Sequence, residues 1–369
     1  MTQQFQIAVF EGDGIGPEIT APCLTVLDSA MARVGGLGAT YKTLPAGARA
    51  YLDEGVALPD KSVEEAHKAD AILLSAMGDP EIRYPDGTEL IPQIELRIRL
   101  GLYAGVRPVR SIPGVRLPIG DARARDMDFV LVRESTEGLF ASIGKGVVEE
   151  NEARETMVIT RKGTENVVRF SLALTELRKK EGQGPGILTC VDKANVFTAF
   201  AFFRKIFDDE AARYPELQTR HAYVDAMAIE MLRRPWDLDV LVTENMFGDI
   251  LSDLGAGLMG GLGFAPSADI GDDDAVFQPC HGSAPDIAGK GLANPTAMFL
   301  SGGMMLEWLG DRHGSKPATQ AGYLVRDAVD MAFADGNLVT FDQGGTVGTK
   351  PVYERVMQCI QSVPLRTIE

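Results

Sequence analysis

The sequence is poor in cysteine and in positive charge. Four cysteines, Cys23, Cys190, Cys280 and Cys359, are scattered over 369 residues without a C-x-x-C pair. This excludes a disulfide framework and a zinc knuckle, and it fits a reduced compartment. Lys and Arg total 36 against 52 Asp and Glu, a formal charge of −16. The chain therefore lacks the basic surplus with which nucleic-acid-binding proteins neutralise phosphates.

Long apolar runs are also missing. No stretch approaches the ~20 apolar residues of a membrane-spanning helix. The N-terminal residues MTQQFQIAVFEGDG contain no basic segment followed by an apolar run and a cleavage site. We therefore expect an untargeted, cytoplasmic protein with no membrane or nucleic-acid partner. Its length suffices for about two domains.

Short apolar runs alternate with amphipathic segments along the chain. The runs FQIAVF, ADAILLSAMG, DMDFVLVRES, GPGILTCVDK and DLDVLVTENM are strand-like, whereas PEITAPCLTVLDSAMARV has helical spacing. This alternation predicts an α/β fold with a mostly parallel sheet. Residues 146–159 break it with two short β-like runs around a polar middle, and predict a hairpin arm. Because a two-stranded arm is marginally stable alone, we expect it to pair with the arm of a second subunit.

The phrase EGDGIGPE at residues 11–18 follows a predicted strand and precedes a predicted helix, like a dinucleotide-binding loop. The third glycine of a G-x-G-x-x-G fingerprint is missing, because that position is Pro17. No acidic residue about 20 positions later ends a clear second strand. An ordinary Rossmann loop is therefore disfavoured, and a bare structural turn stays an alternative.

Arginines are concentrated in ELRIRLGLYAGVRPVR and in the later FVLVRES. Guanidinium groups suit bidentate carboxylate binding. Each arginine alone is more often solvated or paired with surplus acids, but their concentration near predicted strand ends indicates a site for a small anion. The arginines are Arg97, Arg99, Arg107, Arg110 and Arg133.

Asp249 and Asp253 lie four residues apart on a helix that we expect to start near Gly248, so both carboxylates share one face. With a third acid, for instance Asp225, they would form an oxygen site for Mg²⁺ or Mn²⁺. The alternative is that these acids only favour the helix dipole.

Two further loops carry candidate residues. Lys193 and Asn195 follow a predicted strand, and a lysine beside a metal and apolar walls can lose its proton and act as a base. Alone, such a lysine is more often solvated. The glycine-rich stretch PCHGSAPDIAGKGLANP lets backbone amides approach a ligand closely. A metal at His281 is disfavoured, because no second His or Cys lies at ligand spacing.

In this order, the phrases resemble the β-decarboxylating dehydrogenases, the family of 3-isopropylmalate, isocitrate, homoisocitrate, tartrate and D-malate dehydrogenases. The resemblance runs from Ile7 to about Pro351. It implies a two-domain isopropylmalate-dehydrogenase-like fold. Residues 1–104 and 260–369 would form a larger cofactor-binding domain, residues 105–259 a smaller substrate, metal and dimerisation domain, and residues 146–160 the dimerisation arm.

The resemblance also implies a role for individual residues. Lys193 would be the catalytic base, and Lys193 and Asp225 would reach across from the partner subunit of a homodimer. Asp286 would accept hydrogen bonds from the adenine ribose of NAD and repel the 2′-phosphate of NADP. The substrate would contact Arg97, Arg107, Arg133, Ile94 and Asn195. Mg²⁺ or Mn²⁺ would be held by Asp225, Asp249 and Asp253. NAD would contact Ile15, His281, Gly282, Ser283, Ala284, Asp286, Ile287 and Asn294.

Three residues depart from the family pattern. Phe140 stands where the family has the tyrosine that protonates the enolate, Gln278 replaces a glutamate, and Glu11 replaces a proline. Phenylalanine has no proton to donate. Either water or another acid replaces the tyrosine, or turnover is slow, or the reaction stops at oxidation. A catalytically degenerate regulatory subunit and a metal-free hydroxy-acid dehydrogenase therefore stay as alternatives.

The resemblance implies NAD- and metal-dependent oxidation and β-decarboxylation of a 3-substituted malate. Ile91 and Gln93 replace the Ser and Asn of isocitrate enzymes, which disfavours isocitrate. Ile94 fits an apolar isopropylmalate pocket, whereas the phrase RESTEG is closer to the tartrate/D-malate and isocitrate enzymes. The expected substrate is therefore 3-isopropylmalate-like, or tartrate or D-malate.

Overall fold

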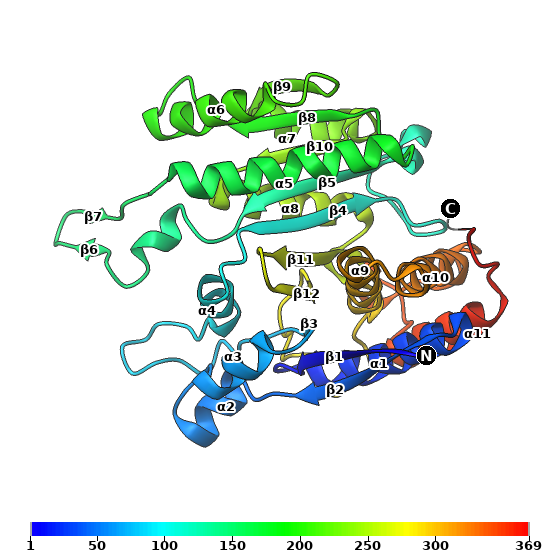
Figure 1. The fold of residues 1–369 in the computed structure, drawn as a ribbon. Helices are drawn as coiled ribbons and strands as arrows, with labels where there is room; N and C mark the ends of the chain where they lie inside the picture. The colour runs from blue at the N-terminus through cyan, green and yellow to red at the C-terminus, as the bar shows by residue number, and fades with distance from the viewer. Residues whose placement is uncertain (1, 368–369) are drawn as a thin grey trace.

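The chain forms one ten-stranded sheet covered by helices on both faces (Figure 1). The computed structural model describes residues 2–367, and the strand order is β2-β1-β3-β12-β11-β4-β5-β10-β8-β9. The strands are β1 (Gln3–Phe10), β2 (Leu37–Thr43), β3 (Ala71–Leu74), β4 (Ala104–Arg110), β5 (Asp128–Glu134), β8 (Ile187–Asp192), β9 (Gln218–Tyr223), β10 (Val240–Thr243), β11 (Pro266–Ile270) and β12 (Ala275–Pro279).

Helices connect most of the strands, as the alternating pattern predicts. Strands β3 and β10 are buried along their whole length, as expected for strands with helices on both faces. Helices α5 and α8 lie on opposite sides of β5 (Figure 1). The helices are α1 (Gly16–Val34), α2 (Gly47–Glu54), α3 (Asp60–His67), α4 (Pro92–Arg99), α5 (Arg161–Lys180), α6 (Thr198–Ala211), α7 (Val224–Arg233), α8 (Asn245–Met259), α9 (Thr296–His313), α10 (Lys316–Phe333) and α11 (Thr349–Ser362).

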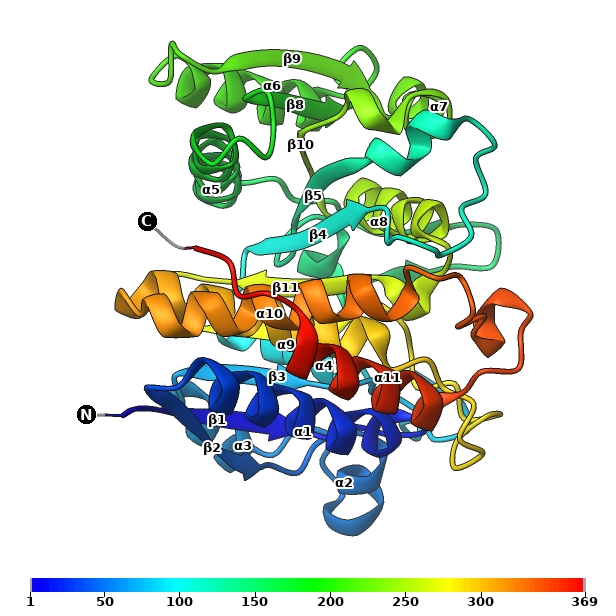
Figure 2. The same ribbon diagram turned by 90° about the vertical axis from the view of Figure 1, so that its right-hand side faces the viewer.

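The sheet is mostly parallel, which confirms the predicted fold class. Antiparallel pairing is confined to β12–β11, β11–β4 and β4–β5 in its centre. Strands β2, β1, β3, β12 and β11 come from the two ends of the chain, and the other five come from its middle (Figure 2). The two groups meet at the short β11–β4 pairing. We propose that this junction divides the two domains at the boundaries predicted above.

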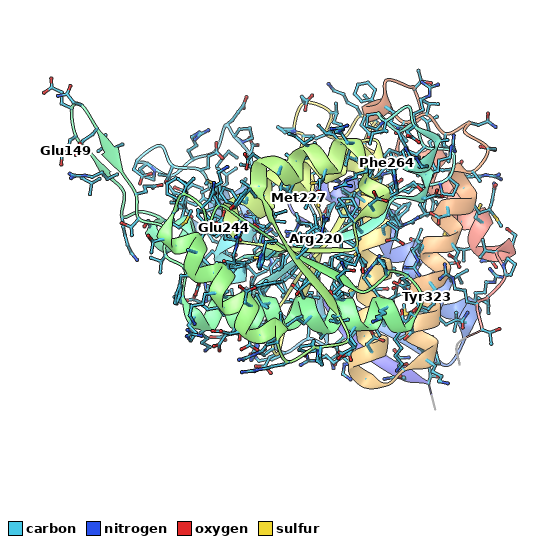
Figure 3. All side chains as sticks on the ribbon, turned by 90° about the horizontal axis from the view of Figure 1, so that it is seen from above. Glu149, Arg220, Met227, Glu244, Phe264 and Tyr323 are labelled. Atoms are coloured by element: carbon cyan, nitrogen blue, oxygen red, sulfur yellow. The ribbon has the colours of Figure 1, made fainter. Side chains whose placement is uncertain are left out.

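The hairpin arm is present where the sequence predicts it. Strands β6 (Val147–Val148) and β7 (Ala153–Arg154) form a separate antiparallel pair. The pair extends away from the body of the protein, with Glu149 near its tip (Figure 3). The side chain of Val148 is 83% exposed. Within residues 2–367, no helix is long and apolar enough to cross a membrane.

Helix α8 begins at Asn245, three residues earlier than the start predicted near Gly248. The difference arises because the side chain of Glu244 caps the helix and accepts hydrogen bonds from the backbone N–H groups of Met246 and Phe247. Gly248 has another function, which is to permit close packing on β5. A Cβ atom at Gly248 would lie 2.6 Å from the Cβ atom of Arg133.

We predict that Gly248→Ala lowers the free energy of unfolding by about 1–3 kcal/mol, because the added methyl group overpacks the contact with Arg133. Gly257→Ala is the matched control, since a Cβ atom at this exposed position of α8 meets no atom within 4 Å. The control should raise stability by about 0.5–1 kcal/mol. Urea denaturation of both variants measures the difference, and equal stability would contradict the close-packing interpretation.

Candidate active site

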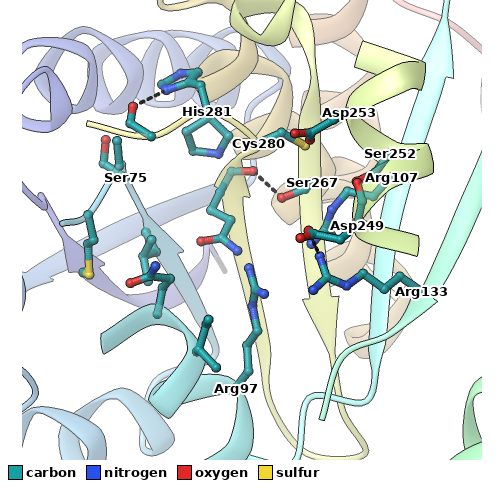
Figure 4. Close-up of a pocket in the computed structure, with 18 of the residues that line it drawn as sticks. Ser75, Arg97, Arg107, Arg133, Asp249, Ser252, Asp253, Ser267, Cys280 and His281 are labelled. Carbon is teal, nitrogen blue, oxygen red and sulfur yellow. Dashed lines mark hydrogen bonds and ion pairs between the residues drawn. The ribbon is translucent and has the colours of Figure 1, made fainter. Parts of the chain in front are cut away.

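A cavity of about 280 Å³ lies where the two groups of strands meet. It is bounded by α4, by the central strands β4, β5, β11 and β12, and by α8 (Figure 4). This cavity contains three of the arginines and two of the aspartates that the sequence singles out. Its charged lining residues are Arg97, Arg107, Arg133, Asp249 and Asp253.

The three predicted arginines converge on this cavity from different elements. Arg97 lies in the last turn of α4, Arg107 on β4 and Arg133 on β5. Each is less than a tenth exposed. Buried guanidinium groups need compensating charge. The additional arginines Arg99 and Arg110 form other ion pairs, with Asp60 and Asp330, so they are not part of the site.

Asp269 on β11 supplies this compensating charge. Its carboxylate is fully buried and lies 2.9 Å from Nε of Arg97 and 3.2 Å from Nη2 of Arg107. The side-chain amide of Gln278 donates a hydrogen bond to Oδ2 of Asp269 at 2.7 Å. Burial opposes ionisation of Asp269, but the charges of Arg107 and Arg97 outweigh it and lower the pKa of the carboxyl. Asp269 is therefore ionised.

Sequence reasoning missed Asp269. The available signal was a single acid in the otherwise uncharged strand PSADI, because an acid in a central strand is buried and requires a cationic or hydrogen-bonding partner. The structure also explains the departure at Gln278. A neutral amide at this position can donate to Asp269, whereas a glutamate would place a second carboxylate there.

Arg133 is oriented by the first turn of α8. Its Nε and Nη2 groups donate to Oδ1 of Asn245 at 3.2 and 2.7 Å. Its Nη1 group donates to Oδ1 of Asp249. Asn245 in turn donates to the backbone carbonyl of Glu137 at 3.1 Å. Asn245 was also missed, because nothing in its local sequence shows that it reaches Arg133.

The chemistry of Asp249 and Asp253 fits a divalent cation. The two carboxylates lie on successive turns of α8 and both line the cavity (Figure 4). Burial and the nearby charge of Asp249 raise the pKa of Asp253. A divalent cation with oxygen ligands relieves this repulsion. Among residues 2–367, however, no three acidic, histidine or cysteine side chains converge on a metal site, so one chain supplies only two acidic ligands.

The remaining predicted catalytic residues lie elsewhere in the same chain. Nζ of Lys193 lies 2.6 Å from Oδ1 of Asp225, and neither residue lines the cavity. The hydrogen bond from Lys193 is the main cause that lowers the pKa of Asp225. Asn195 is exposed beside them. A single chain therefore does not bring Lys193, Asp225 and Asn195 to the arginines.

The two glycine-rich loops pack against each other at one side of the cavity. The backbone N–H group of Ile15 donates to the carbonyl of Ser283 at 2.8 Å, and His281 and Gly282 line the cavity. Ala284 has a φ angle of +39°, and no other non-glycine residue among 2–367 has a positive φ. This conformation shapes the loop that the resemblance assigns to NAD.

His281 offers this loop an open hydrogen-bonding position. Its Nδ1 atom lies 3.0 Å from the carbonyl of Gly282, and its buried Nε2 atom has no partner among the described residues. Burial lowers the pKa of His281, so the neutral ring presents Nε2 as an acceptor. Asp286 is exposed and Ile287 is partly buried, whereas Asn294 bonds to Thr296 and Asp342 within the chain.

Phe140 and Ile94 both line the cavity. The ring centroid of Phe140 lies 5.8 Å from Cζ of Arg133. In the described part of the chain, the residues that line this cavity include no tyrosine and no lysine. A single chain therefore places no phenol or amine in the cavity.

Comparison with known proteins identifies the family. A family model described as isocitrate/isopropylmalate dehydrogenase matches residues 6–356. The chain is 40% identical to a 3-isopropylmalate/3-methylmalate dehydrogenase of Methanocaldococcus jannaschii, over 96% of this chain and 99% of that protein. It is 34% identical to a probable tartrate dehydrogenase/decarboxylase of Bacillus subtilis, over 96% and 97% of the two chains.

A solved isocitrate dehydrogenase from Methylococcus capsulatus superimposes with a TM-score of 0.83 at 34% identity, covering 97% of this chain and all of that chain. The protein belongs to the isocitrate/isopropylmalate dehydrogenase family, as the sequence motifs indicated. It is therefore an oxidatively decarboxylating enzyme of the family that acts on 3-carboxy-2-hydroxy acids.

We predict that Asp249→Asn removes most of the thermal stabilisation by Mn²⁺ and most of the activity, because it neutralises one of the two carboxylates that face the cavity. At 100 times Kd, a ligand stabilises a protein by about 2.7 kcal/mol. Asp209→Asn removes a charge from α6, outside the cavity, and should keep the full Mn²⁺ effect. An unchanged Mn²⁺-induced shift in Tm for Asp249→Asn would reject this metal site.

Proposed function

We propose that the protein oxidises and β-decarboxylates a 3-substituted malate, 3-isopropylmalate-like or tartrate or D-malate, with NAD and Mg²⁺ or Mn²⁺. The observation that supports this most strongly is the cavity in which three buried arginines face two carboxylates. Arg97, Arg107 and Arg133 bind the substrate carboxylates through charge-assisted hydrogen bonds. Ile94 and Phe140 provide apolar surface for the 3-substituent.

The chain's own residues hold the reactants and move a proton. Asp249 and Asp253, with Asp225 of the partner subunit, hold the divalent cation. When bound, the cation would act as a Lewis acid on the substrate oxygens, and NAD would accept the hydride. Lys193 of the partner subunit accepts the proton of the C2 hydroxyl.

The position of Lys193 and Asp225 supports a homodimer with shared sites. Both lie outside the cavity of their own chain, and the side chain of Asp249 is 62% exposed at its edge. Helices α7 and α8, which contact each other, carry exposed apolar side chains. Exposed apolar patches mark interaction surfaces. We propose a second copy of this chain as the partner, with the hairpin arms contributing Val148. The exposed apolar residues of α7 and α8 are Ile229, Leu232, Met246 and Ile250.

In this proposal, Asp286 determines the preference for NAD over NADP. Its carboxylate is exposed on the loop that follows Ala284, where it is free to accept hydrogen bonds from ribose hydroxyl groups. A 2′-phosphate at the same position would meet a like charge, which costs binding energy. NAD is therefore preferred over NADP.

A substrate panel tests the proposed function. 3-Isopropylmalate, D-malate, tartrate, isocitrate and homoisocitrate are each supplied with Mn²⁺ and either NAD or NADP, while reduced nucleotide and released CO₂ are measured. We expect EDTA-sensitive NADH formation from a dicarboxylic 2-hydroxy acid. Activity that persists in EDTA would favour a metal-free dehydrogenase. No turnover of any of these acids would favour a regulatory subunit.

Mixing two inactive variants tests the shared site. Lys193→Ala and Asp249→Asn remove groups that come from different subunits at each site, so a hybrid dimer regains one intact site. Statistical reassembly of equal amounts should restore about a quarter of the wild-type activity. The variants are co-expressed or refolded together, and each alone is the control. No recovery in a mixture shown to contain hybrids would contradict sharing between subunits.

Phe140→Tyr tests the missing proton donor. If enolate protonation is the impaired step, the unprotonated enolate recombines with CO₂ and the β-keto acid leaves the enzyme undecarboxylated. Wild-type protein then releases less CO₂ than NADH, and a phenol at position 140 raises turnover and brings the ratio toward one. General acids that are well placed contribute typically 10²–10⁴-fold. Phe202→Tyr adds a phenol at an exposed position of α6 and should change neither quantity. Equal CO₂ and NADH from a fast wild-type enzyme would show that Phe140 suits the substrate instead.

A further inference from the structure

The charges around the cavity balance. Three arginine side chains face it, and Asp249 and Asp253 line it. Asp269 forms ion pairs with two of these arginines, Arg97 and Arg107. The other titratable lining groups stay neutral, because burial raises the pKa of Cys280 and lowers that of His281. The Lys193–Asp225 pair, which the proposed dimer adds, is itself neutral. Three positive charges therefore meet three negative charges.

Asp269 differs from the other two acids because it is neither exposed nor placed to bind a cation. It is completely buried, and its oxygens are occupied by Arg97, Arg107 and Gln278. It therefore removes one unit of positive charge from the arginine group permanently. Asp249 and Asp253, in contrast, face the cavity, where a divalent cation offsets both.

In the absence of NAD, a bound divalent cation gives the side chains around the cavity two net positive charges, which match a ligand with two carboxylates. A third carboxylate would lie in a low-dielectric cavity without a compensating charge, where uncompensated charge is costly. We propose that Asp269 is a specificity-determining residue that makes this enzyme selective for dicarboxylic over tricarboxylic 2-hydroxy acids. The proposal rests on the function proposed above and narrows its substrate class.

Gln278 allows the charge of Asp269 to be moved to a neighbouring side chain without changing the shape of either side chain. Its amide nitrogen lies 2.7 Å from Oδ2 of Asp269, and the two residues lie on paired strands. Asp269→Asn removes the charge with a side chain of the same shape. Adding Gln278→Glu returns one carboxylate to the same hydrogen-bonded pair, so the double variant restores the net charge of the site.

The test compares methylsuccinate with tricarballylate, a dicarboxylate and a tricarboxylate that cannot be oxidised at C2. Their dissociation constants are measured with Mn²⁺ by calorimetry, and kcat/KM is measured for the best dicarboxylic substrate and for homoisocitrate. We expect wild-type protein to favour the dicarboxylate at least tenfold in both measurements. Asp269→Asn should reduce this preference about tenfold or more, and the double variant should recover it.

Asp273→Asn removes an exposed charge from the neighbouring loop and should leave the preference unchanged. Wild-type protein that binds tricarballylate as tightly as methylsuccinate would overturn the proposal, even if no variant folds. An unchanged preference in folded Asp269→Asn would also overturn it, as would a double variant that behaves like the single one. Because the calorimetry needs no turnover, selective binding by a protein inactive on every acid would reject the proposed function and not this inference.

Discussion

The ion pairs of Asp269 with Arg97 and Arg107 are the interaction on which the site depends. Guanidinium groups placed together in a cavity repel each other and lose hydration, and a buried carboxylate between them offsets both costs. Because Arg107 lies on β4 and Asp269 on β11, one of these ion pairs also crosses the junction between the two groups of strands. Arg97 extends the same connection to α4. The arginine-lined cavity and the centre of the sheet therefore share one buried charge.

Helix α8 completes the site through its packing on β5. Gly248 allows the close approach, and Asn245 and Asp249 then reach the guanidinium of Arg133. The same helix presents Asp253 to the cavity and exposes Ile250 on its outer side. A helix that carries metal-binding candidates on one side and an exposed apolar side chain on the other suits a site completed by a second subunit.

The sequence predicted features that depend on local patterns. The α/β class and the hairpin arm follow from periodicity, and the placement of Asp249 and Asp253 on one helix face follows from their spacing. The arginine cluster follows from the number of arginines near the predicted strand ends. Asp269 and Asn245 were missed because their importance arises from contacts between distant strands and helices, which no local pattern shows. The predicted start of α8 was wrong because Glu244, which caps the helix, is not among the usual capping residues. The residue roles and the substrate came from the family resemblance alone.

The proposed completion of each site by two subunits can be observed directly. A crystal structure of the enzyme with Mn²⁺ and a bound dicarboxylate, with anomalous data collected at the manganese edge, locates the ion and its ligands. We predict Mn²⁺ bound by Asp249 and Asp253 of one subunit and by Asp225 of the other, with Lys193 of that second subunit beside the substrate hydroxyl. An ion coordinated by a single chain, or bound away from the three arginines, would contradict the shared site.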